Sequence, residues 1–207
     1  MESSKRISNA ERRSLFRSFS TTDDSEAMVK GDSAQKEYPN NHDHLIRVAE
    51  SGDLKRFLDL LDNGASLDTK LAFFNINCVH ISCLQDQVEI LRAIFERNKV
   101  KFIELFSDRN FLSMTPLLVA CRQSAKRCIY FFICLGILGE FDLESTLNVK
   151  DIFNKTALDW AVSKDNGDCI RYIVMTMLYI FVRDVNSLKN NELSRVESNL
   201  QVRYLFS

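Results

Sequence analysis

The sequence is poor in glycine, proline and histidine. Only six glycines and two prolines occur among 207 residues, and no Gly-rich phosphate-binding loop is present. The cysteines include no C-x-x-C pair of the kind that zinc sites and redox motifs use. We therefore interpret them as small buried hydrophobic residues of a protein from a reducing compartment. They are Cys78, Cys83, Cys121, Cys128, Cys134 and Cys169.

A large net charge and long apolar runs are also lacking. The formal net charge of −1 gives no overall basic field for nucleic acid or for an anionic membrane. The longest apolar run near the C-terminus, residues 172–182, is too short to span a bilayer. The first 20 residues are charged throughout and contain no secretory signal. We expect a cytoplasmic protein without a transmembrane segment, and a nuclear location or a peripheral membrane contact stays open.

The few histidines do not form a convincing active site. His42 and His44 flank Asp43, but no further metal ligand accompanies them. His80 lies near Cys78 and Cys83 in the sequence, yet Cys78 and His80 fall on different faces of a helix and nothing supplies an oxyanion site. The sequence therefore predicts no catalytic residue, no cofactor and no metal.

What the sequence does contain is a repeated two-helix pattern. The clearest copies open with Met114-Thr115-Pro116-Leu117-Leu118-Val119-Ala120 and with Lys155-Thr156-Ala157-Leu158-Asp159-Trp160-Ala161, and an apolar second helix follows each. A degenerate copy opens at Asn77, and another begins near Asp43. These four openings are separated by 34, 38 and 41 residues.

This pattern resembles the ankyrin repeat, a unit of about 33 residues with a T-P-L-H-x-A opening, a β-turn and two helices. The resemblance implies an all-α solenoid of helix-turn-helix repeats with short β-turn fingers. Four degenerate repeats are expected near residues 43–70, 73–106, 111–147 and 152–186, within a domain of residues 43–186. The extra length is expected as insertions after the second and third helical pairs. The resemblance also implies that His80 hydrogen-bonds the neighbouring turn.

Turn residues support the same division. Gly64, Asn98 and Gly136 stand where the second helix of a unit would end in a left-handed residue. Two residues before each opening, where the family usually has glycine, the sequence has Asn75, Ser113 and Asn154. Met177 stands where the fourth repeat would have its glycine, so we expect that last helix to continue through residues 178–182.

The turn fingers are the predicted partner-binding surface. In ankyrin-type arrays the fingers and first helices line a concave surface for protein recognition, and eight of the nine variable finger residues here are apolar. The alternative is that insertions at residues 99–108 and 137–148 fold over the fingers and bury them. The nine residues are Phe73, Phe74, Ile76, Phe111, Leu112, Met114, Ile152, Phe153 and Lys155.

The two ends of the chain are polar. Residues 1–41 are predicted to be a disordered Ser/Arg-rich tail. Basic residues precede Ser8 and Ser20, as basophilic kinases prefer, so phosphorylation would reverse the local positive charge. The alternative is that Arg and Ser only keep the tail in solution. Residues 187–207 are predicted to be a polar tail or a capping helix, because Leu193, Val196 and Leu200 recur at helical spacing.

Three functions are compatible with these features. We expect a non-enzymatic adaptor that binds a protein through its fingers, with a kinase acting on the tail. The alternative is a scaffold that docks onto a larger or membrane-associated assembly through apolar outer helices; ankyrin domains at the cytoplasmic ends of transient receptor potential cation channels offer a parallel. A small enzyme is the third. Exposure of Tyr172, Met175, Tyr179 and Val182 would favour the scaffold.

Overall fold

The computed structural model describes residues 41–205 apart from residue 72, and it describes side chains between residues 44 and 189. These residues belong to one compact unit, Asn40–Ser207. Helix α2 begins at Asn41, two residues before the predicted domain start. The rest of the predicted N-terminal tail, with Ser8 and Ser20, lies outside the described residues.

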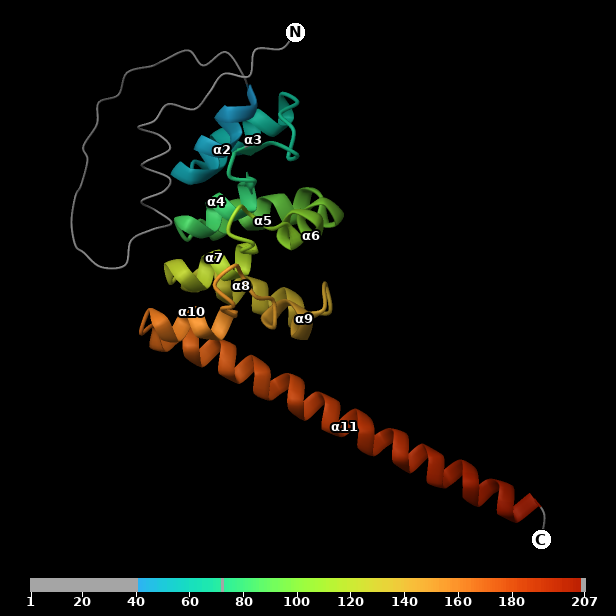
Figure 1. Cartoon of the computed structure of the whole chain (residues 1–207). Helices are drawn as coiled ribbons and strands as arrows, with labels where there is room; N and C mark the ends of the chain where they lie inside the picture. Colours follow the sequence, from blue (N-terminus) through green and yellow to red (C-terminus); the bar gives the residue numbers. More distant parts are fainter. Residues whose placement is uncertain (1–40, 72, 206–207) are drawn as a thin grey trace. The chain divides into compact units, whose positions relative to one another are not determined.

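Four helix pairs are stacked in chain order (Figure 1). The first helices α2, α4, α7 and α10 pack successively on one another, and the second helices α3, α5, α8 and α11 form a parallel layer. The all-α, ankyrin-type array that the sequence predicts is therefore confirmed. The pairs are α2 (Asn41–Ser51) with α3 (Leu54–Asp62), α4 (Cys78–Leu84) with α5 (Val88–Arg97), α7 (Pro116–Gln123) with α8 (Lys126–Ile137), and α10 (Ala157–Ser163) with α11 (Gly167–Leu205).

Three of the pairs open with an equivalent capping residue. Asn77, Thr115 and Thr156 each precede a first helix, and each side-chain oxygen accepts a hydrogen bond from the backbone N–H three residues later. A cap of this kind stabilises a helix by about 1 kcal/mol. The alignment of these openings from the sequence is therefore correct.

Left-handed residues recur at two places in the repeat. In the fingers they are Asn75, Ser113 and Asn154, with φ of 50°, 56° and 59°, as the sequence predicts. A second set lies in the turn between the helices of each pair. This set repeats the separations of 34, 38 and 41 residues, so the geometry is shared by all four units. Its members are Gly52 (φ 73°), Asp86 (φ 53°), Ser124 (φ 59°) and Asp165 (φ 49°).

The predicted left-handed ends of the second helices are right in one case only. Gly64 has φ of 86°, as expected. Asn98 has φ of −153° and instead caps the next helix by accepting a hydrogen bond from the Lys101 backbone N–H. Gly136 lies inside α8, where a Cβ atom would come within 2.6 Å of Leu143 Cδ1. This glycine permits close packing, and the left-handed residue is Gly139.

The two insertions follow the second and third pairs, as expected, and each contains a short helix. These are α6 (Lys99–Ser107) and α9 (Leu143–Leu147). The Phe106 ring lies 4.6 Å from Phe132 of α8 and 4.6 Å from Phe141, between centroids. Phe102 also packs near Phe131 and Phe132. The insertion phenylalanines thus bury α8, and in the ring contacts of the described residues they do not meet the finger rings.

Helix α11 continues well beyond the length of the other second helices. It passes Met177 without a break, as predicted, and runs to Leu205 (Figure 1). Residues 187–205 are therefore the continuation of α11. The polar tail or capping role of residues 187–207 stays a prediction. Among the described helices, α11 included, none combines the length and apolar character needed to cross a membrane.

Candidate protein-interaction surfaces

The fingers form a ladder along one side of the stack. The first finger is an antiparallel β-hairpin whose strands, β1 (Lys70–Leu71) and β2 (Ile76–Asn77), have two residues each. The Phe111 backbone N–H of the second finger donates to Phe74 O at 2.9 Å, and the Ile152 N–H of the third donates to Leu112 O at 3.1 Å. Each finger is thereby fixed to the one before it, which gives a rigid surface.

Two polar residues that the sequence reasoning missed shape the second and third fingers. Asn110 Oδ1 accepts hydrogen bonds from the backbone N–H groups of Leu112 and Met114. Asp151 Oδ1 makes the same pair of bonds to Phe153 and Lys155. Both residues stand five positions before their repeat opening, so a search for Asn or Asp at that offset would have found them.

The finger residues differ sharply in exposure. Phe74, Ile76 and Met114 are buried, so the predicted ridge of exposed apolar residues is wrong for these three. The rings of Phe73 and Phe111 each lie 5.2 Å from Phe74, which places Phe74 inside the ladder. The remaining members divide into half-buried Phe111, Leu112 and Lys155, and exposed Phe73 (67 %), Ile152 (56 %) and Phe153 (55 %).

Trp160 is the centre of the third finger. Its indole N–H donates to Asp151 Oδ2 at 2.7 Å, and Lys155 Nζ lies 4.3 Å from the ring centroid. The Arg122 guanidinium lies over the ring at 5.0 Å, and burial lowers the pKa of this arginine. The tryptophan is buried, so it serves packing within the array.

His80 is part of the repeat framework. Its Nδ1 lies 2.8 Å from Asn77 Oδ1 and its Nε2 lies 3.1 Å from the Met114 carbonyl oxygen in the next finger. Burial lowers the pKa of His80 to about 4, so the ring is neutral at pH 7. The predicted contact between His80 and the neighbouring turn is confirmed. Burial also raises the pKa of Cys78 to about 12, which opposes formation of a thiolate.

The second candidate surface is the outer face of α11. Cys169, Ile173, Thr176 and Ile180 are buried against the array, which leaves the other sides of the helix uncovered. The sequence predicts that exposure of four residues of this helix would favour the scaffold alternative. Three of them, Met175, Tyr179 and Val182, are exposed, and Tyr172 is half-buried near Tyr130. Up to residue 189, where the side-chain description ends, the exposed large hydrophobic residues of α11 are Val174, Met175, Met177, Leu178, Tyr179, Phe181, Val182, Val185 and Leu188.

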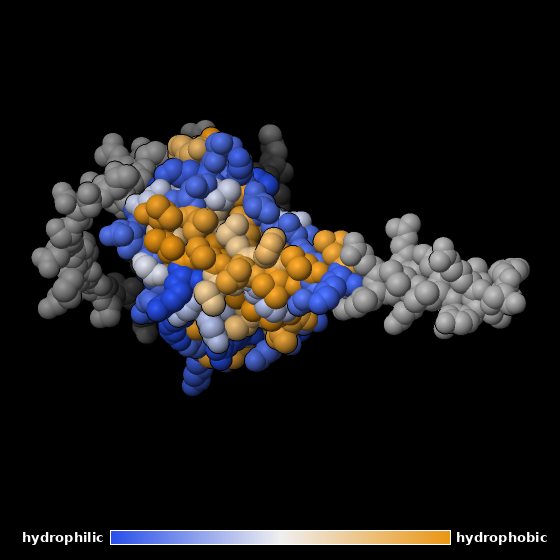
Figure 2. All heavy atoms as spheres, turned by 90° about the horizontal axis from the view of Figure 1, so that it is seen from below, coloured by the Kyte–Doolittle hydropathy of each residue, from blue (hydrophilic) through white to orange (hydrophobic). Residues whose placement is uncertain are grey.

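Figure 2 shows this end of the array directly. Apolar residues gather across the face seen there and continue outward to where the side-chain description ends. Val162 of α10, 56 % exposed, also belongs to the exposed apolar residues at this fourth pair. The last pair thus leaves uncovered the kind of surface that each earlier pair buries against its successor.

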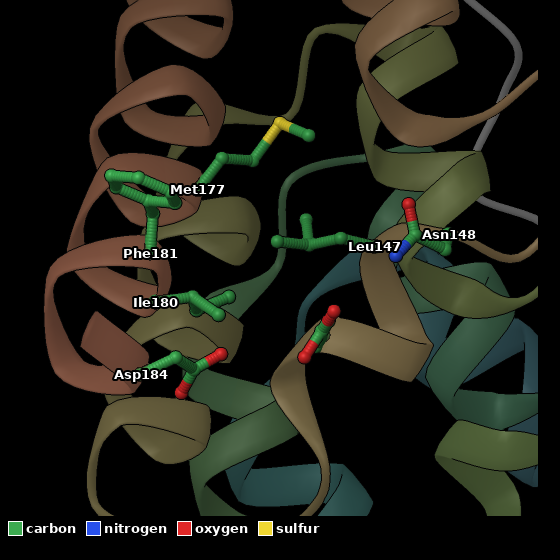
Figure 3. Close-up of a pocket in the computed structure, with 7 residues that line it drawn as sticks. Leu147, Asn148, Met177, Ile180, Phe181 and Asp184 are labelled. Atoms are coloured by element: carbon green, nitrogen blue, oxygen red, sulfur yellow. The ribbon is translucent and has the colours of Figure 1, made fainter. Parts of the chain in front are cut away.

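A groove of about 180 Å³ borders this face between α9 and α11 (Figure 3). Leu147 extends from α9 towards α11, while Met177, Ile180 and Phe181 line the opposite wall. Glu144 and Asp184 add two carboxylates to the lining. The groove therefore has apolar side chains on both walls, and its polar lining consists of these two carboxylates and Asn148.

Comparison with known proteins supports the fold. No family model matches the sequence, and no curated protein matches it. Solved structures of the thermo-sensitive channel TRP1 from the alga Chlamydomonas reinhardtii do match, at 23 % sequence identity over 84 % of this chain. The TM-score is 0.59 for the channel in nanodiscs and 0.60 in detergent. This chain covers 21 % and 23 % of those channel chains, so it spans about a fifth of their length and shares the fold of that part.

Proposed function

We propose that the chain is a non-enzymatic protein-interaction module of the ankyrin-repeat type that docks onto another protein through the exposed face of α11. One observation carries the proposal: nine large hydrophobic side chains are exposed between residues 174 and 188 of this helix. A contiguous apolar surface of this kind marks an interaction site in a soluble domain. The proposal is the scaffold alternative from the sequence, and it moves the docking surface away from the fingers.

The energetics favour docking at α11. Fully burying one aliphatic or aromatic side chain contributes about 1.5–3 kcal/mol. Burial of several such side chains therefore offsets the free-energy cost of the translational and rotational freedom lost on association, which is about 4–15 kcal/mol. The fingers offer fewer candidates, since Phe73, Ile152 and Phe153 are their exposed apolar members.

The proposal of a non-enzymatic role has its own support. His80 uses both ring nitrogens in contacts with Asn77 and Met114 O, and burial raises the pKa of the adjacent Cys78 and Cys83 thiols. Within the described residues there is no group of three or more His, Cys, Asp or Glu side chains that would hold a metal. Likeness to part of a channel chain fits a module that works within a larger assembly.

Affinity purification with mass spectrometry on the full chain tests this function. One variant combines Leu178→Asp with Phe181→Asp on α11, and the matched variant combines Ile152→Asp with Phe153→Asp on the third finger. All four side chains are exposed, so each variant should keep the fold. We expect the α11 variant to lose the captured proteins and the finger variant to keep them. The reverse pattern would restore the finger surface as the docking site.

Regulation by the N-terminal tail is a separate part of the proposal. Phosphorylation of Ser8 and Ser20 would add about −1.5 to −2 charges each to residues 1–22, whose five basic and two acidic residues give a net charge of +3. Comparing proteins captured by the wild type and by the Ser8→Ala, Ser20→Ala variant after kinase treatment measures this effect. Identical capture with and without phosphate would remove the regulatory role.

A further inference from the structure

We infer that α11 pairs with α11 of a second copy of this chain as a parallel two-stranded coil. This inference rests on the proposed docking role of α11 and names its partner. The seam consists of five exposed apolar residues that follow one another at intervals of four, three, four and three. They are Val174 (45 % exposed), Leu178 (52 %), Phe181 (65 %), Val185 (45 %) and Leu188 (65 %).

This spacing is that of the a and d positions in a heptad repeat, the pattern by which one helix packs along another. The next position towards the N-terminus is Arg171, which pairs with Asp168, and the next towards the C-terminus is Glu192. The seam is therefore two heptads long with polar ends. Met175 and Val182 flank it on the exposed side and widen the apolar contact.

Charge complementarity selects a second copy in parallel orientation. With Leu178 and Val185 at a positions, Asp184 occupies a g position and Lys189 the following e position. In a parallel coil, g of one helix lies beside e of the next heptad in its partner, so two symmetric Asp184–Lys189 pairs form. The Asp184 side chain is 48 % exposed and Lys189 is exposed. Arg183 already pairs with Asp184, but Glu144 lines the same groove, so the two carboxylates and one guanidinium keep a net negative charge for the partner's lysine.

The charges of α11 argue against a membrane surface as the occupant. Helices that lie on anionic lipid carry an excess of Lys and Arg on the polar face. Here Arg171 is paired with Asp168 and Arg183 with Asp184, so acidic and basic residues alternate along the described part of the helix. A self-complementary helix satisfies both signs of charge.

Sedimentation equilibrium of the full chain tests the pairing. We expect the wild type to be a dimer and Leu178→Asp to be a monomer at the same concentration. Tyr179→Asp places the same charge on the neighbouring exposed residue outside the seam, and we expect it to remain dimeric. Circular dichroism confirms the fold of each variant. A monomeric wild type, or a dimer that tolerates Leu178→Asp, would overturn the inference.

Charge exchange tests the orientation. Asp184→Lys and Lys189→Asp should each weaken the dimer about tenfold, because two symmetric pairs become repulsive. The double variant should recover wild-type association. Failure of the double variant to recover would refute the parallel arrangement.

The outcomes also separate this inference from the proposed function. If the wild type is monomeric yet captures proteins that the α11 variant loses, the docking function stands and self-pairing is wrong. If a monomeric wild type instead co-sediments with phosphatidylserine vesicles and Leu178→Asp does not, a lipid surface replaces the second copy. If α11 substitution changes neither association nor capture, both proposals fail.

Discussion

The fingers and helix α11 carry apolar residues of the same kinds, yet the array uses them in opposite ways. Phe74 lies between the rings of Phe73 and Phe111 and is 3 % exposed. Phe181, on the last second helix, is 65 % exposed. The difference is one of position in the stack, because each finger is covered by the next one, whereas no described helix pair follows α10 and α11.

This contrast shows how a repeat array separates core from docking surface. Every unit presents an apolar flank that its successor buries, so the same sequence pattern is structural inside the stack and available for binding at its end. In the interior units several predicted binding residues, such as Phe74 and Met114, are therefore buried by packing, although Phe73 stays exposed. Binding is expected where the succession stops.

The largest expected difference is between removing a buried ring of the fingers and removing an exposed ring of α11. We expect Phe74→Ala to lower the free energy of unfolding by about 3–5 kcal/mol, because it leaves a cavity in the finger ladder. Phe181→Ala removes the same atoms from an exposed site, so it should change the free energy of unfolding by less than about 0.5 kcal/mol in dilute protein. Urea unfolding followed by circular dichroism measures both. Equal losses would mean that the two rings do not differ in burial.

The pH dependence of stability probes the connection between α4 and the next finger. The pKa of His80 falls from its ordinary value of 6.5 to about 4 in the folded chain, so the unfolded chain binds the proton more tightly. The free energy of unfolding should therefore fall as the pH is lowered from about 6.5 to 4, by about 3 kcal/mol. Denaturant titrations across this range should show the loss, and His80→Gln should remove most of it. An unchanged slope in His80→Gln would assign the effect to other groups.

Removing a finger carboxylate should have a smaller effect. Asp151→Ala leaves three donors without their acceptor, namely the backbone N–H groups of Phe153 and Lys155 and the Trp160 indole N–H. We expect a loss of about 2–3 kcal/mol and a red shift in the emission of the single tryptophan. Asp168→Ala, which removes two exposed ion pairs, with Arg171 of α11 and with Lys126 of α8, should cost less than about 1 kcal/mol. Similar losses in both variants would contradict the rigid finger.

The smallest predicted effect is a gain in stability on substituting a left-handed finger residue. Ser113 has φ of 56°, a conformation that disfavours residues with a Cβ atom. Ser113→Gly should therefore raise the free energy of unfolding by about 0.5 kcal/mol after the entropy cost of glycine. At Asn75 and Asn154 the same substitution should gain less, since asparagine tolerates this region. A thermal unfolding series of the three variants checks the order, and destabilisation by Ser113→Gly would show that its side chain is needed.

Much of the array was predictable because its signals are local. The openings at Asn77, Thr115 and Thr156 act through side-chain caps three residues away, and the left-handed Asn75, Ser113 and Asn154 are set by turn geometry. The continuation of α11 beyond Met177 followed from the lack of a glycine there. These features depend on a few neighbouring residues.

The errors came from contacts that join distant segments. The burial of Met114 depends on packing across repeats, and the role of Gly136 depends on the approach of Leu143. The insertions contained enough phenylalanine to cover either the fingers or α8, and sequence spacing does not choose between them. Asn110 and Asp151 differ from these cases, because their bonds run to backbone N–H groups two and four residues along the same finger, and the apolar pattern of the fingers gives no signal for them.

Hydroxyl-radical footprinting of the full chain at rising protein concentration tests the central claim most directly. Met175 and Phe181 should be oxidised in dilute protein and become protected as copies associate, while Phe73 and Phe153 react equally throughout. Buried Met114 serves as the unreactive internal reference. Protection of Phe73 and Phe153 with Met175 and Phe181 still reactive would contradict the account, because the fingers and not α11 would then be the docking surface.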